Sequence, residues 1–127
     1  MANRVIMFDT SIFIDHLRTN KHAGHFQNLS GLIRNSSVVL SELARGATNE
    51  SELDFVSILA KNHPILIPTE RNWLESGPLL YRMHEDKGFS PGKLRDLHFD
   101  VLIALTAKSR CHGDYFRQSG FRTDQAL

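Results

Sequence analysis

The chain has 127 residues, about the size of one ordinary domain, and its 41% hydrophobic and 23% charged residues are typical of a folded globular protein, so we expect a single domain over 1–127. Fifteen Lys and Arg against fourteen Asp and Glu give a formal net charge of +1, which argues against a partner held mainly by a basic field, such as duplex DNA or an anionic membrane. The single cysteine, Cys111, excludes an intramolecular disulfide and a multi-cysteine zinc site, and it fits the reducing cytoplasm. No apolar stretch approaches the roughly 18 residues of a membrane span.

The first quarter of the chain predicts a buried strand followed by two helices. Residues 4–9 form a continuous apolar run that ends in an acid, which favours a strand buried on both faces. Thr10 and Ser11 then offer caps for a short helix over 12–18. Apolar residues at helical spacing predict a second helix over 23–33.

The middle of the chain predicts two more strands, each followed by a helix. Short β-branched runs favour strands, whereas a Ser, Thr or Asn ahead of an apolar stripe favours a capped helix that ends at Gly or Pro. In chain order we expect a strand over 37–40, a helix capped by Ser41 and closing at Gly46, a helix capped by Asn49 with Glu52 three residues on and ending before Pro64, and a strand over 65–67.

Two longer helices complete the predicted fold. Thr69 caps a helix that runs to about Lys87, and Ser90-Pro91 provides a cap and a favourable first position for another. Residues 101–105 are apolar on every side, as in a helix packed deep inside. Strands that alternate with helices predict parallel strands joined by helical crossovers, so we expect an α/β fold, a three-layer α/β/α sandwich around a short parallel sheet.

Common motifs of phosphate and zinc chemistry are absent from the sequence. Gly92-Lys93 is followed by Leu94 and is not preceded by a strand, so a phosphate-binding loop is not expected. Asp9-Thr10-Ser11 lacks the second Asp of an aspartyl phosphatase, and the third strand ends in Pro68-Thr69 where a phospho-receiver domain needs an acid. The seven histidines form no His-Glu-x-x-His pattern, so a closed zinc site has little support.

Three carboxylates stand out by their placement. Asp9 ends the first predicted strand, Glu42 lies just past the second, and Asp100 opens the most apolar helix. Because the carboxyl ends of neighbouring parallel strands meet at one edge of a sheet, these acids can come together there. Two unit charges about 4 Å apart repel by about 4 kcal/mol at an effective dielectric near 20, so such a cluster calls for a divalent cation. An all-oxygen site suits Mg²⁺ or Mn²⁺, which lowers the pKa of a water and stabilises the charge of a phosphodiester under in-line attack.

The three acids lie in apolar segments whose order and spacing are specific. The segments are Val5-Ile-Met-Phe-Asp9-Thr-Ser11, Leu40-Ser-Glu42-Leu-Ala-Arg-Gly46 and Leu97-His-Phe-Asp100-Val-Leu-Ile-Ala-Leu-Thr-Ala107. Over roughly residues 4–110 the chain therefore resembles the PIN domain family, in particular the bacterial VapC-type toxins.

The resemblance implies a metal-dependent ribonuclease of a toxin–antitoxin system, commonly a homodimer, that is inhibited by a small antitoxin folding over the site. It implies that Asp9, Glu42 and Asp100 bind Mg²⁺ or Mn²⁺ and act in cleavage. It also implies that Ser11 is a hydrogen-bonding neighbour of Asp9.

The tail, residues 111–127, departs from the family pattern. PIN domains usually continue into a further apolar strand and a polar segment that supplies another group to the site, and this tail has no apolar run. We therefore expect the C-terminal strand region to be atypical or truncated, with the loss of an edge strand from the sheet. Asp114 and Asp124 are acids of the right type outside that context, and Asp96, one turn before Asp100, is a further secondary candidate.

Two classes of function follow from these observations. The first is a toxin-type endoribonuclease that hydrolyses RNA with a metal-activated water, and the alternative is a catalytically weakened PIN fold that acts as an antitoxin-binding or decoy module. A small nucleotide-binding α/β domain is a remoter third. Several basic residues have the charge to hold RNA phosphates, and the sequence singles out none of them: Arg45, Lys87, Lys93, Arg95, Lys108 and Arg110.

Overall fold

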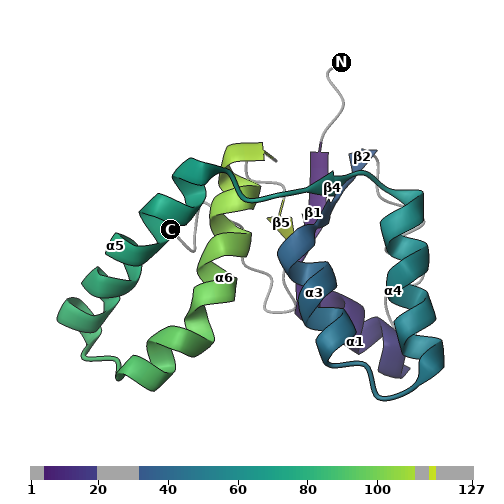
Figure 1. Cartoon of the computed structure of the whole chain (residues 1–127), viewed down its shortest axis with the longest axis horizontal. Coiled ribbons are helices and arrows are strands. Elements are labelled where there is room, and N and C mark those ends of the chain that lie inside the picture. The colour runs from purple at the N-terminus through teal and green to yellow at the C-terminus, as the bar shows by residue number, and fades with distance from the viewer. Residues whose placement is uncertain (1–4, 20–31, 111–114, 117–127) are drawn as a thin grey trace.

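The structure is a computed structural model that describes residues 5–19, 32–110 and 115–116 (Figure 1). Helices dominate it, and the strands are short. In chain order the elements are β1 (Val5–Phe8), α1 (Thr10–Thr19), β2 (Leu32–Ile33), β3 (Asn35–Ser36), α3 (Ser37–Arg45), α4 (Glu50–Asn62), β4 (Ile65–Leu66), α5 (Glu70–Lys87), α6 (Pro91–Arg110) and β5 (Tyr115–Phe116). No helix in these ranges is long and apolar enough to cross a membrane.

Every described strand pair is parallel, and β1 lies at the centre. β1 pairs with β2 on one side and with β5 on the other, while β3 pairs with β4. The backbone N–H of Arg34 donates to the Ile6 carbonyl at 2.9 Å, and that of Asn35 donates to the Pro64 carbonyl at 3.0 Å. The segment 32–36 therefore joins the two ladders, because it bonds to β1 at its start and to β4 at its end.

The strands lie between two groups of helices, with α1, α3 and α4 on one side and α5 and α6 on the other (Figure 1). This arrangement confirms the predicted α/β class with its short parallel sheet. The strand predicted over 4–9 and the helices predicted to begin after Asn49, Thr69 and Ser90 are also confirmed, within one or two residues at their ends.

The core joins β1 to helix α6. Ile6, Met7 and Phe8 of β1 are buried, and so is every residue from 101 to 107 of α6. Leu102 packs with the β1 residues, whereas Leu105 on another face of the same helix packs with Leu80 of α5. Because α6 is covered on both sides, its sequence is apolar all round, as predicted.

The strand predicted over 37–40 is wrong, because these residues form the first turn of α3. The helix begins one residue after Ser36, whose hydroxyl accepts hydrogen bonds from the N–H groups of Val38 and Val39 at 3.1 and 3.3 Å. The N-cap is therefore Ser36 and not Ser41. A cap and a buried apolar face outweigh the modest strand preference of two valines, and a run of four residues is too short to distinguish the two structures by periodicity. The predicted end at Gly46 is confirmed.

Two further predictions fail at the ends of the sheet. The helix predicted over 23–33 is wrong at Leu32–Ile33, which form β2, and the rest of that range lies outside the described residues. The expected loss of the edge strand is also wrong, because Tyr115–Phe116 form β5 beside Met7 and Phe8, although a strand of two residues agrees with the predicted truncation of this region. Tyr and Phe favour strands, and the otherwise open edge of β1 supplies the hydrogen-bonding groups, so two residues suffice without an apolar run.

Candidate active site

Asp9 follows the last residue of β1 and precedes the first residue of α1. Its side chain is largely buried, with the residue 7% exposed. The Ser11 hydroxyl donates a 2.8 Å hydrogen bond to Asp9 Oδ2, and the Asp9 carbonyl accepts from the Ile12 N–H at 3.2 Å. A buried carboxylate needs such donors, so the strand end and the first turn of α1 together hold the Asp9 carboxyl in one orientation.

Glu42 lies in the second turn of helix α3, six residues past the end of β3, whereas the sequence predicts it in the first turn of a helix just past a strand. The Thr10 hydroxyl donates to Glu42 Oε1 at 2.8 Å, a contact between residues 32 positions apart. The Arg45 guanidinium lies 3.9 Å from Glu42 Oε2. Thr10 is the neighbour of Asp9, so two successive hydroxyl side chains, Thr10 and Ser11, orient two different carboxylates.

Asp100 lies midway along α6 and does not open the helix, because α6 begins at Pro91. It is half-buried where the exposed first half of α6 gives way to the buried second half. The pKa of the Glu42 carboxyl is raised above its ordinary value of 4.5, first by burial and then by the negative charges of Asp100 and Asp9. The Thr10 hydrogen bond and the Arg45 charge oppose that shift. The Thr10–Glu42 hydrogen bond places α3 beside the end of β1 that carries Asp9, and the charges of Asp9 and Asp100 both act on Glu42.

The coupled acids have the donor chemistry of a divalent-metal site. All three supply carboxylate oxygens, which are the ligands that Mg²⁺ and Mn²⁺ prefer. In the described part of the chain, no three His, Cys, Asp or Glu side chains converge closely enough to chelate an ion as they stand. Carboxylates that repel one another without a counter-charge are expected to be spread apart in this way. The residues present therefore fit such an ion in charge and donor type.

A family model described as PIN domain matches residues 6–111 of the chain. The chain belongs to the PIN domain family. PIN domains of the VapC type are typically nucleases, and PIN nucleases generally use divalent metal ions.

Two solved structures resemble this PIN domain in fold. The crystal structure of DNA-bound VapBC from Salmonella typhimurium contains a chain with 22% identity and a TM-score of 0.60, and the match covers 90% of this chain and 83% of that one. The crystal structure of VapBC2 from Rickettsia felis, bound to a DNA fragment from their promoter, contains one with 22% identity and a TM-score of 0.58, with 81% and 79% covered. Such identities show the shared fold alone. No curated protein matches the chain.

The secondary candidate acids of this PIN domain lie apart from the three coupled ones or outside the described residues. Asp96 is exposed on α6, and its charge is not among the causes that shift the pKa of Glu42. Asp114 and Asp124 lie outside the described residues. The described part of the site therefore consists of Asp9, Glu42 and Asp100 with their hydroxyl and guanidinium neighbours.

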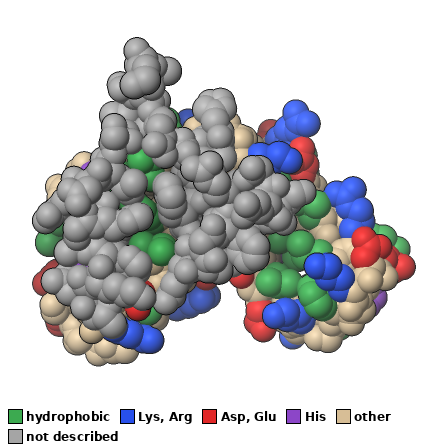
Figure 2. All heavy atoms as spheres, turned by 180° about the vertical axis from the view of Figure 1, so that it is seen from behind, with side chains coloured by type: hydrophobic (Ala, Val, Ile, Leu, Met, Phe, Trp, Pro, Cys, Tyr) green, Lys and Arg blue, Asp and Glu red, His purple; other side chains and the backbone are tan. Residues whose placement is uncertain are grey.

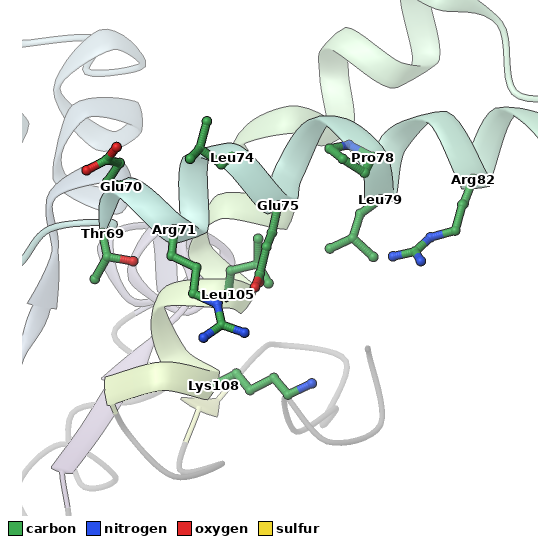
Figure 3. Close-up of a pocket in the computed structure, with 10 residues that line it drawn as sticks. All are labelled: Thr69, Glu70, Arg71, Leu74, Glu75, Pro78, Leu79, Arg82, Leu105 and Lys108. Carbon is green, nitrogen blue, oxygen red and sulfur yellow. Dashed lines mark hydrogen bonds and ion pairs between the residues drawn. The ribbon is translucent and has the colours of Figure 1, made fainter.

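A large groove lined by described residues lies away from the three acids. The groove, of about 840 Å³, runs along α5 and the end of α6, and none of the three acids is among its described lining residues (Figure 3). Leu74, Leu79 and Leu105 line it together with Arg71, Arg82 and Lys108. On the lobe formed by α5 and α6, apolar side chains lie between cationic and anionic ones (Figure 2). Size alone does not identify a catalytic site, and the groove lacks the coupled carboxylates, so we place the candidate active site at the acids.

Sequence reasoning missed two neighbours of the acids in this PIN domain. The sequence predicts Thr10 as a helix cap, yet its hydroxyl donates to Glu42, and the run of polar residues Asp9-Thr10-Ser11 is the available signal. Arg45 is one of six basic residues that the sequence does not separate from one another, and in the structure it pairs with Glu42. Its spacing of three residues from Glu42 on a helix is the pattern that brings two side chains to one face.

The raised pKa of Glu42 makes a prediction about stability and pH. A raised pKa means that the native state holds the proton more tightly than the unfolded chain does, so ionised Glu42 lowers stability progressively as the pH rises above about 4.5. Glu42→Gln keeps an oxygen that accepts from Thr10 and removes the charge. We expect the metal-free variant to be more stable than the parent at neutral pH, with a smaller difference near pH 4.5. Urea unfolding in EDTA at both pH values measures this.

Glu85→Gln is the matched control for this measurement, since Glu85 is exposed on α5. The gain from that control should be close to zero at both pH values. A gain of equal size in the two variants, or a Glu42→Gln gain that grows as the pH falls, would show that the pKa of Glu42 is not raised in the native state.

Proposed function

We propose that this PIN domain is a metal-dependent endoribonuclease and the toxin of a type II toxin–antitoxin pair. The observation that carries the proposal is the placement of three acids from distant parts of the chain: the Thr10–Glu42 hydrogen bond brings α3 to the residue beside Asp9, and the charges of Asp9 and of Asp100 on α6 raise the pKa of Glu42. Like charges in one place destabilise the fold, so repelling acids of this kind favour a functional role over a structural one. Membership in a family whose nucleases generally use divalent ions supports the same conclusion.

Asp9, Glu42 and Asp100 are the residues that would hold Mg²⁺ or Mn²⁺. A divalent ion bound there would lower the pKa of the attacking water and stabilise the charge that develops on the phosphodiester. The protein's own contribution is orientation. Ser11 holds Oδ2 of Asp9 and Thr10 holds Oε1 of Glu42, so each carboxylate has one oxygen anchored by a hydroxyl group.

The proposed partners are an RNA substrate in the cytoplasm and a small antitoxin protein, and the protein itself is proposed to form a homodimer. The similar folds in the two VapBC structures support the antitoxin partner, because both structures are DNA-bound toxin–antitoxin complexes. The alternative, a weakened PIN fold that acts as a decoy, rested on a lost edge strand. β5 pairs with β1 in the structure, which removes that reason for preferring it.

The test is cleavage of a labelled single-stranded RNA of mixed sequence by the purified full chain. We expect cleavage with Mg²⁺ or Mn²⁺, none in EDTA, and recovery when the metal is returned in excess. Cleavage that persists in EDTA would contradict the metal-dependent mechanism. A folded protein that cuts no RNA with either metal, yet binds an antitoxin encoded beside it, would favour the decoy function instead.

A further inference from the structure

Arg45 lies at the edge of the three-acid site, between the two helices that carry Glu42 and Asp100. It is the last residue of α3, three residues after Glu42, and its guanidinium carbon lies 5.7 Å from the centre of the Phe99 ring on α6. Phe99 immediately precedes Asp100. A contact that reaches from α3 to α6 therefore holds this cation beside the acids.

The guanidinium of Arg45 is available to a ligand. Its Nη2 atom lies 3.9 Å from Glu42 Oε2, at the outer limit of an ion pair, and the side chain is 70% exposed. Pairs this exposed contribute little net free energy because water and salt screen them. A guanidinium presents five N–H donors in a planar fork that matches phosphate oxygens. Arg45 can thus exchange a carboxylate for a phosphate while its side chain stays against Phe99.

The other basic residues suggested by the sequence lack this placement in the described structure. Lys87 and Lys93 both lie 5.9 Å from the centre of the Phe89 ring, at the turn between α5 and α6. Lys108 lines the groove along α5 (Figure 3). Of the six basic residues named from the sequence, Arg45 is the one whose described ion pair is with an acid of the candidate site.

We propose that Arg45 binds a phosphate of the RNA strand that lies across the three acids. The inference rests on the proposed ribonuclease function and names a substrate-binding residue for it. Three carboxylates repel an RNA backbone, so a strand that approaches them needs a cation in the same place. The proximity of Arg45 to Glu42 and its contact with Phe99 put that charge at a defined position, which helps to fix which phosphodiester lies at the acids.

The experiment measures binding separately from cleavage. Affinity for a fluorescein-labelled single-stranded RNA of mixed sequence is followed by fluorescence anisotropy in EDTA, which prevents metal-dependent cleavage, over a series of NaCl concentrations. The proteins are the parent, Arg45→Gln, which removes the charge, and Arg45→Lys, which keeps it. Arg71→Gln is the matched control, because Arg71 is 86% exposed and pairs with Glu75 on α5. Thermal midpoints establish that all four proteins are folded.

We expect Arg45→Gln to weaken binding about fivefold at low salt and to make the slope of log K against log salt shallower by about 0.7, the value for one lost phosphate contact on a single strand. Arg45→Lys should keep most of the slope, and Arg71→Gln should match the parent. In Mg²⁺, Arg45→Gln should raise KM for RNA cleavage and change kcat by less than about twofold. The reason is that the contact with the phosphate is present both in the enzyme–substrate complex and in the transition state.

Two outcomes overturn the inference in different ways. A parent that binds and cleaves RNA, with an Arg45→Gln slope equal to that of the parent or to that of Arg71→Gln, shows that Arg45 contacts no phosphate and leaves the ribonuclease function standing. A folded parent that neither binds nor cleaves RNA overturns the ribonuclease function, and the role of Arg45 fails with it.

Discussion

Replacing Asp9 by Asn is expected to abolish metal-dependent RNA cleavage, with a loss of at least about 100-fold, since changes even to the groups around metal ligands cost 10- to 100-fold. Asn keeps the size of the side chain and an oxygen that accepts from Ser11, so the fold around β1 is retained. It lacks the charge that binds a divalent ion. A discontinuous assay with the labelled RNA in Mg²⁺ and in Mn²⁺ measures the loss.

The same substitution should separate binding from folding. In the parent, a metal at a hundredfold excess over its Kd should add about 2.7 kcal/mol to the free energy of unfolding, which corresponds to a rise of roughly 10 °C in Tm. In Asp9→Asn that rise should disappear. Metal-free Asp9→Asn should be more stable than the metal-free parent, because one of three repelling charges has been removed.

Asp54→Asn is the control for both measurements, since Asp54 is exposed on α4 and the chemical change is identical. It should show the activity and the metal-dependent rise in Tm of the parent. An Asp9→Asn protein that keeps its metal response would contradict the assignment of Asp9 as a ligand. Metal-free Asp9→Asn less stable than the parent would instead tell against a cluster of repelling acids.

Replacing Leu102 by Ala is expected to have the largest effect on stability, about 2–5 kcal/mol. Leu102 is 0% exposed and packs in the core that joins α6 to β1, so the truncation leaves a cavity that the neighbouring helices and strands cannot fill. Small domains have only about 5–15 kcal/mol of stability in total. Urea unfolding in the presence and absence of metal gives the free energy of unfolding.

Leu74→Ala makes the same chemical change on an exposed position of α5, where the residue is 68% exposed. Its effect should stay within about 0.5 kcal/mol. Leu102→Ala should also weaken metal binding, because Leu102 lies two residues after Asp100 on the helix that positions it. A loss below about 1 kcal/mol would mean that α6 does not pack on β1 as the structure shows.

The elements that could be predicted from the sequence are those whose ends are decided locally. Thr69 and Asn72 form a capping box in which each side chain accepts from the other residue's N–H at 3.0 Å, and both partners lie within four residues of sequence. Asn49 likewise accepts from the Glu52 N–H at 2.9 Å. Gly88 ends α5 with a φ of 67°, a conformation that glycine adopts at little cost. Such signals can be read without knowledge of the rest of the fold.

The elements that could not be predicted are short and depend on distant partners. Ser36 caps α3 because the chain leaves β3 there, and β3 exists only because Asn35 and Ser36 pair with β4. Tyr115–Phe116 form a strand because β1 offers a free edge more than 100 residues earlier in the chain. A two-residue strand contains too few side chains for a period of two to be visible.

By itself the sequence determined the α/β class, the apolar segments and the family resemblance, and it singled out three acids as candidates, because residue types, their order and their spacing carry that information. Only the tertiary structure decided how the site is supported: Glu42 on a helix with Thr10 as its donor, Asp100 midway along α6 beside Phe99, and Arg45 reaching between the two helices. The physical reason is that hydrogen bonds, burial and charge coupling act over a few ångströms in space. Residues 32 or 58 positions from Glu42 come within that range only after the chain has folded.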